Sequence, residues 1–207
     1  SNTYDITAWA LPYAYGLNAY GLKDGLSGTH SFIEEQKKAL PNATKPYAWV
    51  LPWGTMEDAK TLMTLQQHDI KVRMAEQSFT IGGVTYKPGT LLVYRAENEK
   101  KIRSVQPLVE RLLKGNNVNY QVLSSGYVEK GKDFGSSTYR LLSLPKVAVL
   151  TGQETSSQSV GEIWHFFEQE LNYPISLLNV TAAANLDISK VNTLIVPDGY
   201  YGDKLAE

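Results

Sequence analysis

The 207-residue chain contains no cysteine, only three histidines and no long apolar run. Without cysteine it has no disulfide, no thiolate metal site and no cysteine nucleophile, and the redox compartment stays open. Twenty basic residues against 21 acidic ones give a formal net charge of −1. A chain this close to neutrality has no overall field that attracts nucleic acid or a membrane surface, so neither partner is expected. No segment approaches the roughly 18 apolar residues that cross a bilayer, so no membrane span is expected.

The composition that is present belongs to an ordinary folded protein. Hydrophobic residues make up 43% of the chain and charged residues 20%, which excludes a disordered or fibrous protein. The chain begins at Ser1 without an initiator methionine and stops soon after an apolar run. We therefore expect a fragment of a longer protein, so the missing signal peptide says nothing about the parent's location.

Residues 1–143 are predicted to form an α/β accessory subdomain behind an irregular lead-in rich in Tyr and Gly. The run 47–51 has the continuous apolar character of a strand buried on both faces. Thr55 is placed to cap a helix over 55–68, with acidic residues in the first turn. Gly82-Gly83 between two short apolar runs predicts an inserted β-hairpin, because paired glycines accept the positive φ of a tight turn.

The end of this first part is less regular. Apolar spacing predicts a helix from Ile102 to Leu113, but Pro107 lies inside it, so this helix is kinked or begins later than the pattern suggests. Residues 124–143 look like a loop and are predicted to contain the domain boundary.

Residues 144–207 are predicted to be the N-terminal half of a doubly wound domain, cut short by the end of the chain. Strands are expected at 146–150, 175–180 and 191–196, as parallel neighbours, with a helix at 157–172 on one face. Ser159 and Glu162 have the spacing of a capping box. The overall fold class expected is α/β, with a mostly parallel sheet, flanking helices and a flavodoxin-like C-terminal half. The earlier subdomain or a second copy of the chain is expected to cover the other sheet face, which makes a homo-oligomer conceivable.

The histidines do not complete a metal site. His165 and Glu168 have the H-x-x-E spacing of two zinc ligands, but no later histidine supplies a third. A polar pair on an amphipathic helix is the favoured interpretation. His30 with Glu34 has i, i+4 spacing without a visible partner, and His68 suits the carbonyl end of its helix. No metal ligand and no catalytic residue are predicted.

Two loops are the candidates for ligand binding. Gly152, Ser156 and Ser157 lie between a strand and a helix, where doubly wound folds bind anions and cofactors. Asp198 and Gly199 follow the last predicted strand. Neither loop matches a phosphate-binding or nucleophile-elbow motif, and a simple turn is the favoured alternative for both.

Aromatic residues crowd the start of the chain, at Trp9, Tyr13, Tyr15 and Tyr20. Such a cluster can bind a glycan or a peptide, because it offers large rigid surfaces with polar tips. Packing within the protein is the alternative, and it is favoured because aromatic rings are usually buried.

Three pieces carry a family resemblance: Tyr4-Asp5-Ile6-Thr7-Ala8-Trp9-Ala10-Leu11-Pro12, the strand 146–152 with Ser156-Ser157 and Gly161-Glu162-Ile163-Trp164-His165-Phe166-Phe167-Glu168, and Leu194-Ile195-Val196-Pro197-Asp198-Gly199. Together they resemble the region after the peptidase domain in large secreted bacterial zinc carboxypeptidase-like proteins. In those proteins this region is similar to a class I glutamine amidotransferase-like domain.

The resemblance implies an accessory role. The family's zinc ligands lie in the preceding peptidase domain, and no residue here matches them, so zinc is expected only in the parent's peptidase domain and no cofactor in this fragment. An amidotransferase-like site needs a cysteine nucleophile, which is absent, and Asp198-Gly199 lacks the glycine pair of such an oxyanion loop. We therefore expect a non-catalytic region of a secreted or periplasmic metallocarboxypeptidase, with the parent's own peptidase domain as partner. A glycan- or peptide-binding module is the alternative.

Overall fold

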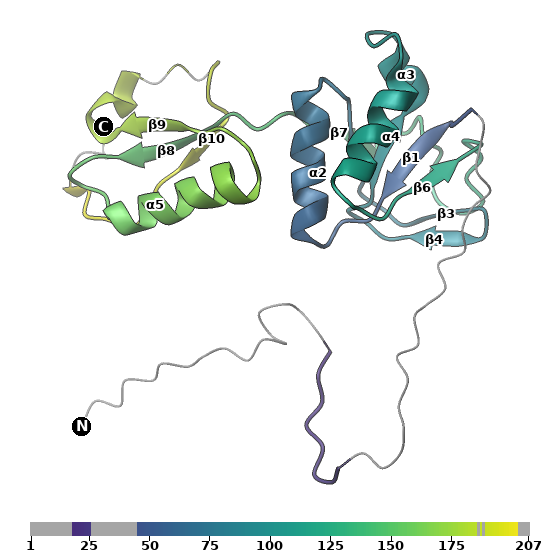
Figure 1. Ribbon diagram of the computed structural model, residues 1–207, viewed down its shortest axis with the longest axis horizontal. Helices are drawn as coiled ribbons and strands as arrows, with labels where there is room; N and C mark the ends of the chain where they lie inside the picture. The colour runs from purple at the N-terminus through teal and green to yellow at the C-terminus, as the bar shows by residue number, and fades with distance from the viewer. Residues whose placement is uncertain (1–17, 26–44, 186, 188, 203–207) are drawn as a thin grey trace. The chain divides into compact units, whose positions relative to one another are not determined.

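The computed structural model describes residues 18–25, 45–185, 187 and 189–202 (Figure 1). The chain divides into two compact units, Ser1–Lys37 and Lys38–Glu207. In the first unit, residues 18–25 are exposed and form no helix or strand. All the elements below belong to the second unit. The domain boundary expected near residue 143 stays a prediction.

The first sheet of the second unit has five strands in the order β6-β1-β5-β2-β7. These strands are β1 (Ala48–Leu51), β2 (Arg73–Ala75), β5 (Leu91–Tyr94), β6 (Gln121–Leu123) and β7 (Tyr139–Leu141). Every neighbouring pair is antiparallel. The prediction of a mostly parallel sheet is therefore wrong for this part of the chain.

The error has a topological cause. β1 and β2 are both antiparallel to β5, so they run in the same direction, as a strand–helix–strand unit predicts. They are not neighbours, however, because the chain returns after the hairpin and places β5 between them. The sequence pattern correctly predicted that the strands before and after α2 run in the same direction, but it did not predict that β5 lies between them.

Helices cover one face of this sheet. α2 (Met56–Gln67) and α4 (Val105–Gly115) pack on it, with Trp49, Leu65 and Val109 fully buried between helices and strands (Figure 1).

The predicted cap at Thr55 is confirmed, since Thr55 and Asp58 form a complete capping box. α4 begins at Val105, so the later start is confirmed. Pro107 then lies in the first turn, where its missing N–H costs no helical hydrogen bond.

The other face is covered by the predicted hairpin and an aromatic layer. β3 (Phe79–Ile81) and β4 (Val84–Tyr86) pair antiparallel, with φ of 60° at Gly82 and 72° at Gly83. Phe79, Phe134 and Tyr139 pack against one another, with ring centroids 5.0–5.6 Å apart. The layer explains why β1 is buried on both faces although its sheet is antiparallel.

The second sheet has the parallel arrangement that the sequence predicted. β8 (Val147–Thr151) lies between β10 (Thr193–Ile195) and β9 (Ser176–Asn179), and both pairs are parallel. The described residues therefore form a mixed α/β architecture, with an antiparallel five-stranded sheet, the antiparallel β3–β4 hairpin and a parallel three-stranded sheet.

The predicted helix over 157–172 is divided in two. α5 (Ser157–His165) continues into a π-helical turn, η1 (Phe166–Glu170), and a 3₁₀ segment, η2 (Val180–Asn185), follows β9. The N-cap is Ser156, not Ser159, so the capping-box assignment is wrong. The π turn shifts the register of the apolar stripe: Leu171 is buried, but Trp164 stays 38% exposed.

Candidate functional site

The structure brings the two predicted ligand loops together at the carboxyl ends of β8 and β10. The backbone N–H of Ser156 donates to the carbonyl of Asp198 over 2.8 Å, and the N–H of Tyr200 donates to the carbonyl of Glu154 over 2.8 Å. Thr155 and Gly199 form an isolated β-bridge. The placement of the loops at one sheet edge is the arrangement that a doubly wound fold uses for ligands.

The loop contacts require glycine. A Cβ on Gly199 would lie 2.2 Å from the carbonyl oxygen of Glu154, which is closer than any real contact. Gly152 has a φ of 145°, and a Cβ there would lie 2.8 Å from a carboxylate oxygen of Glu154. Both glycines therefore have a structural role that the sequence motif did not distinguish from ligand binding.

The polar groups of the loops hold the backbone in place. The Ser156 hydroxyl accepts the N–H of Ser159 at 3.3 Å as the N-cap of α5. The Thr155 hydroxyl donates to the Gly152 carbonyl at 3.0 Å. Ser157 and Asp198 are exposed. A groove of ≈310 Å³ begins at this edge and runs along α5; its lining includes Gly152, Ser157, Val160, Gly161, Trp164 and Leu177.

The remaining sequence candidates lie apart from this edge. His165 ends α5 with an exposed side chain, and Glu168 lies in the π turn. His68 is at the end of α2, where Nδ1 lies 2.9 Å from the carbonyl oxygen of Thr64. No group of three or more His, Asp or Glu side chains within the described ranges could hold a metal ion. His30 and Glu34 lie outside the described residues.

The aromatic cluster at the start of the chain is mostly outside the described residues. Of its members, only Tyr20 is described, and it is 85% exposed. Trp9, Tyr13 and Tyr15 lie outside the described residues.

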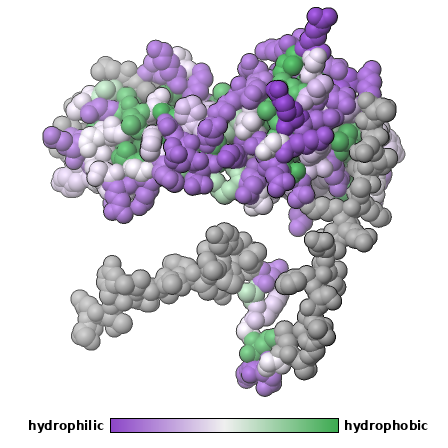
Figure 2. Space-filling view, viewed as in Figure 1, coloured by the Kyte–Doolittle hydropathy of each residue, from purple (hydrophilic) through white to green (hydrophobic). Residues whose placement is uncertain are grey.

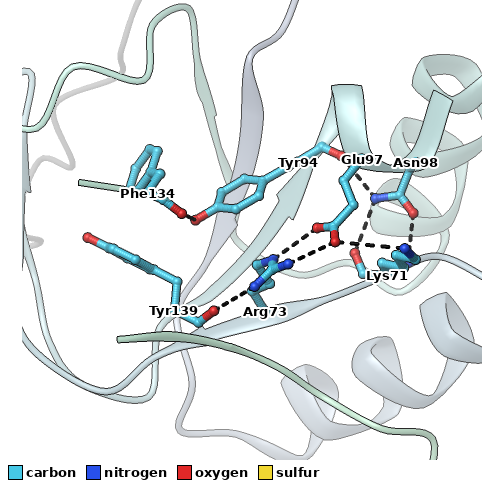
Figure 3. Close-up of polar contacts among 7 residues, drawn as sticks. All are labelled: Lys71, Arg73, Tyr94, Glu97, Asn98, Phe134 and Tyr139. Atoms are coloured by element: carbon cyan, nitrogen blue, oxygen red, sulfur yellow. Dashed lines mark hydrogen bonds and ion pairs between the residues drawn. The ribbon is translucent and has the colours of Figure 1, made fainter. Parts of the chain in front are cut away.

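A second cavity, which sequence reasoning missed, lies beside the aromatic layer of the first sheet. We call it the Arg73 pocket; it has a volume of ≈380 Å³, and its lining includes Tyr47, Arg73, Tyr94, Glu97, Lys100 and Phe134. Arg73 and Tyr94 come from adjacent strands, while Glu97 follows directly in α3 (Arg95–Glu99). Figure 3 shows the Arg73 side chain directed toward the carboxylate of Glu97 and the backbone carbonyl of Tyr139.

Hydrogen bonds fix the Arg73 guanidinium on two sides. Its Nε and Nη2 each donate to a carboxylate oxygen of Glu97 over 2.9 Å, and Nη1 donates to the Tyr139 carbonyl over 2.8 Å. The guanidinium also lies over the Tyr94 ring, 5.9 Å from its centroid. A two-point pair of this kind is strong and directional, so the guanidinium is held in one orientation.

The pair sets the protonation states in the pocket. The hydrogen bond from Arg73 lowers the pKa of Glu97, and the bond to Glu97 raises the pKa of Arg73. Burial raises the pKa of the Tyr94 phenol, which donates to the Phe134 carbonyl at 3.3 Å. At neutral pH the pocket therefore holds a charged Arg–Glu pair beside a neutral phenol.

A buried asparagine anchors α3 beside the pocket. Asn98 is 2% exposed. Its amide donates to the carbonyls of Tyr94 and Lys71, and its oxygen accepts the N–H of Lys71 at 2.7 Å (Figure 3). Asn98 thus ties α3 to Lys71, just before β2, and holds the neighbouring Glu97 near Arg73.

One sequence signal could have found this site. Arg73 is a charged residue between apolar Val72 and Met74, and Glu97 comes soon after the apolar run 91–94. A cation on a half-buried strand needs a partner, and the nearest acidic residue after a neighbouring strand is a candidate. The adjacency of the two strands, however, is a tertiary fact.

Comparison with known proteins gives no relative: no family model, no curated protein and no solved structure matches this chain. Among the described residues, no helix is long and apolar enough to cross a membrane.

Proposed function

We propose that this chain is a non-catalytic accessory region of a secreted or periplasmic zinc carboxypeptidase-like protein. In this proposal the parent's peptidase domain carries the zinc and releases C-terminal residues from peptides. The part formed by residues 146–202 is the beginning of a flavodoxin-like, amidotransferase-like domain that packs against that peptidase domain.

The observation that carries the proposal is the apolar surface of the second sheet. Leu194 is 42% exposed and Val196 is 49% exposed, at alternate positions of one edge. Leu194 pairs with Ala148 in the ladder, so its side chain shares the face of Ala148. Val147 and Ile195 belong to the opposite face, where Phe167 packs on them. Ala148 on the same face is fully buried, so Leu194 and Val196 form an exposed apolar strip at the edge of that face. Parallel sheets are normally covered on both faces, so this strip is where a covering partner would dock.

The hydropathy of the surface agrees with this reading. Figure 2 shows hydrophobic residues open to solvent in the part of the molecule formed by residues 146–202. Leu177 is 56% exposed and Phe166 41% exposed in the same part, but Leu177 pairs with Val149 and so lies on the face opposite Leu194. The docking surface assigned here is therefore limited to Leu194 and Val196.

Strand order and loop chemistry also support the proposal. The order β9-β8-β10 is that of strands two, one and three in the flavodoxin-like arrangement. The hydroxyl groups of Thr155 and Ser156 serve the loop and the helix cap. The proposal therefore assigns the loop edge a structural role.

A direct test measures activity and association separately. The isolated chain should bind no stoichiometric zinc by elemental analysis and should hydrolyse neither peptides nor glutamine. Stoichiometric zinc or measurable turnover would overturn the non-catalytic assignment.

Association is tested with the parent's peptidase domain expressed as a separate polypeptide. Leu194→Lys should abolish co-purification, because a charge in a buried apolar interface is costly. Gln169→Lys, at an exposed position of the π turn, is the matched control and should leave it unchanged. Equal behaviour of the two variants contradicts the assigned docking face.

A further inference from the structure

We propose that the Arg73 pocket is a binding site for a small organic monocarboxylate with an apolar or aromatic body. The pocket has the size of a small-molecule site, ≈380 Å³ against about 300–1,000 Å³ for typical ligand pockets. It binds this ligand whether or not the chain serves as an accessory region.

The walls of the pocket fit the body of such a ligand. Tyr47 is 41% exposed at the rim, while Phe134 is 5% exposed beneath it. Their rings are stacked at 6.1 Å with an interplanar angle of 23°. Together with Ala96, these side chains give a largely apolar surface that an aliphatic or aromatic group can contact.

The charge of the lining fits one negative charge. Arg73 and Glu97 neutralise each other, which leaves Lys100 as the uncompensated charge of the pocket lining. Lys100 is close enough to help lower the pKa of Glu97. Among the residues that the structure describes, no carboxylate forms an ion pair with Lys100. The lining thus has a net charge of +1, which matches a monoanion better than a dianion or a cation.

The lining also supplies donors for the carboxylate. A guanidinium has five N–H groups, and Glu97 and the Tyr139 carbonyl use three of those on Arg73. The other two N–H groups and the Lys100 ammonium remain to donate to a ligand. Because Glu97 and Tyr139 hold the guanidinium in place, binding costs little side-chain entropy.

A cationic ligand fits the same pocket poorly. The Arg73 guanidinium already lies over the Tyr94 ring, 5.9 Å from its centroid, and the one carboxylate of the lining, Glu97, is already paired with Arg73. A second cation would also be repelled by Lys100. The geometry therefore selects for an anion.

The first experiment compares three probes by calorimetry and by protein-observed NMR. N-acetylphenylalanine carries the carboxylate and the apolar body, N-acetylphenylalaninamide lacks the charge, and inorganic phosphate lacks the body. The acid should bind at least about tenfold more tightly than either. Its shifts should centre on Arg73 and Lys100. Equal binding of acid and amide, or tighter binding of phosphate, would overturn the proposal.

The second experiment separates the pocket from general surface charge. Lys100→Gln should weaken binding of the acid about five- to tenfold. Lys101→Gln removes the same charge at the adjacent exposed position, which does not line the pocket, and should change the affinity less than about twofold. Equal effects of the two substitutions would show that only the surface field acts, which contradicts a specific site.

A third variant tests the location without changing charge. Gly135 lines the pocket, a Cβ there would meet no atom within 4 Å, and its φ is not positive, so Gly135→Leu should be tolerated and should place an apolar side chain at the pocket. Binding of the acid should be lost while the midpoint of urea unfolding stays unchanged. Full binding by a folded Gly135→Leu protein would overturn the proposal, and if that variant fails to fold, the pair of lysine variants decides.

Discussion

The five-stranded and the three-stranded sheet of the second unit differ in how their faces are covered. In the five-stranded sheet, helices pack on one face and an aromatic layer on the other, so Trp49 and Val93 are fully buried. In the three-stranded sheet, only the central strand, β8, is fully buried, with Ala148 and Leu150 at 0% exposure. Its edge strands leave Leu177 and Leu194 at 56% and 42%. Completeness of packing is thus set by the surroundings as well as by strand composition, since leucine is fully buried in β5 and β8 but exposed in β9 and β10.

Two tryptophans give the largest contrast between the sheets. Trp49→Ala empties a fully buried site and should lower the free energy of unfolding by about 3–5 kcal/mol. Trp164→Ala, at a side chain that is 38% exposed, should cost about 1 kcal/mol. Urea denaturation followed by circular dichroism measures both. Equal losses would show that the second sheet is packed as fully as the first.

Two glycines of the parallel part separate a close backbone contact from an open position. Gly199→Ala should destabilise the junction of the two loops by about 1–3 kcal/mol, because the new Cβ overlaps the Glu154 carbonyl. Gly161→Ala, inside α5 with no atom within 4 Å of the new Cβ, should stabilise by about 0.5–1 kcal/mol. Hydrogen exchange of residues 152–160 reports the local effect. A neutral Gly199→Ala would contradict the loop geometry.

The Arg73–Glu97 pair makes the stability of the first sheet depend on pH. The folded-state pKa of Glu97 is lowered, so its contribution is present above the unfolded-state pKa and is lost as pH falls through the folded-state value. Glu97→Gln should cost about 1–2 kcal/mol at pH of about 7. The difference in free energy of unfolding between Glu97→Gln and the unsubstituted chain should shrink as pH falls below about 4.

Denaturation curves of both proteins across this pH range measure the difference. Glu76→Gln is the control, because Glu76 forms only an exposed pair with Arg140. If the difference in unfolding free energy between the unsubstituted chain and Glu97→Gln does not vary with pH, the Arg73–Glu97 pair does not have the proposed role.

The smallest contrast lies in the two helix caps. Thr55 and Asp58 exchange hydrogen bonds in a complete capping box, whereas Ser156 accepts one bond at 3.3 Å. Thr55→Ala should cost about 1 kcal/mol, and Ser156→Ala about 0.5 kcal/mol. Thermal unfolding of both variants, with Ser157→Ala as the control, measures the difference. A larger loss for Ser156→Ala would reverse the ranking of the caps.

Local features of the fold were predictable from the sequence, because they depend on neighbouring residues. The Gly82-Gly83 turn, the Thr55 cap and the parallel strands 146–150, 175–180 and 191–196 were predicted from pattern alone. β7 was missed, because Tyr139 lies in a stretch of glycine and serine that reads as a loop. The loop candidates Gly152 and Gly199 were placed at the correct edge, because parallel crossovers bring the ends of their strands together.

The sequence by itself determined most of the segments that become helices, strands and turns, since capping, glycine φ preferences and apolar periodicity act over a few residues. Only the tertiary structure decided that β5 inserts between β1 and β2, and this insertion makes both of its pairs antiparallel. The same insertion brings Tyr94 and Glu97 beside Arg73 and so creates the pocket. Such contacts form between residues more than twenty positions apart, and their free energy depends on the whole set of packed surfaces, which no local pattern encodes.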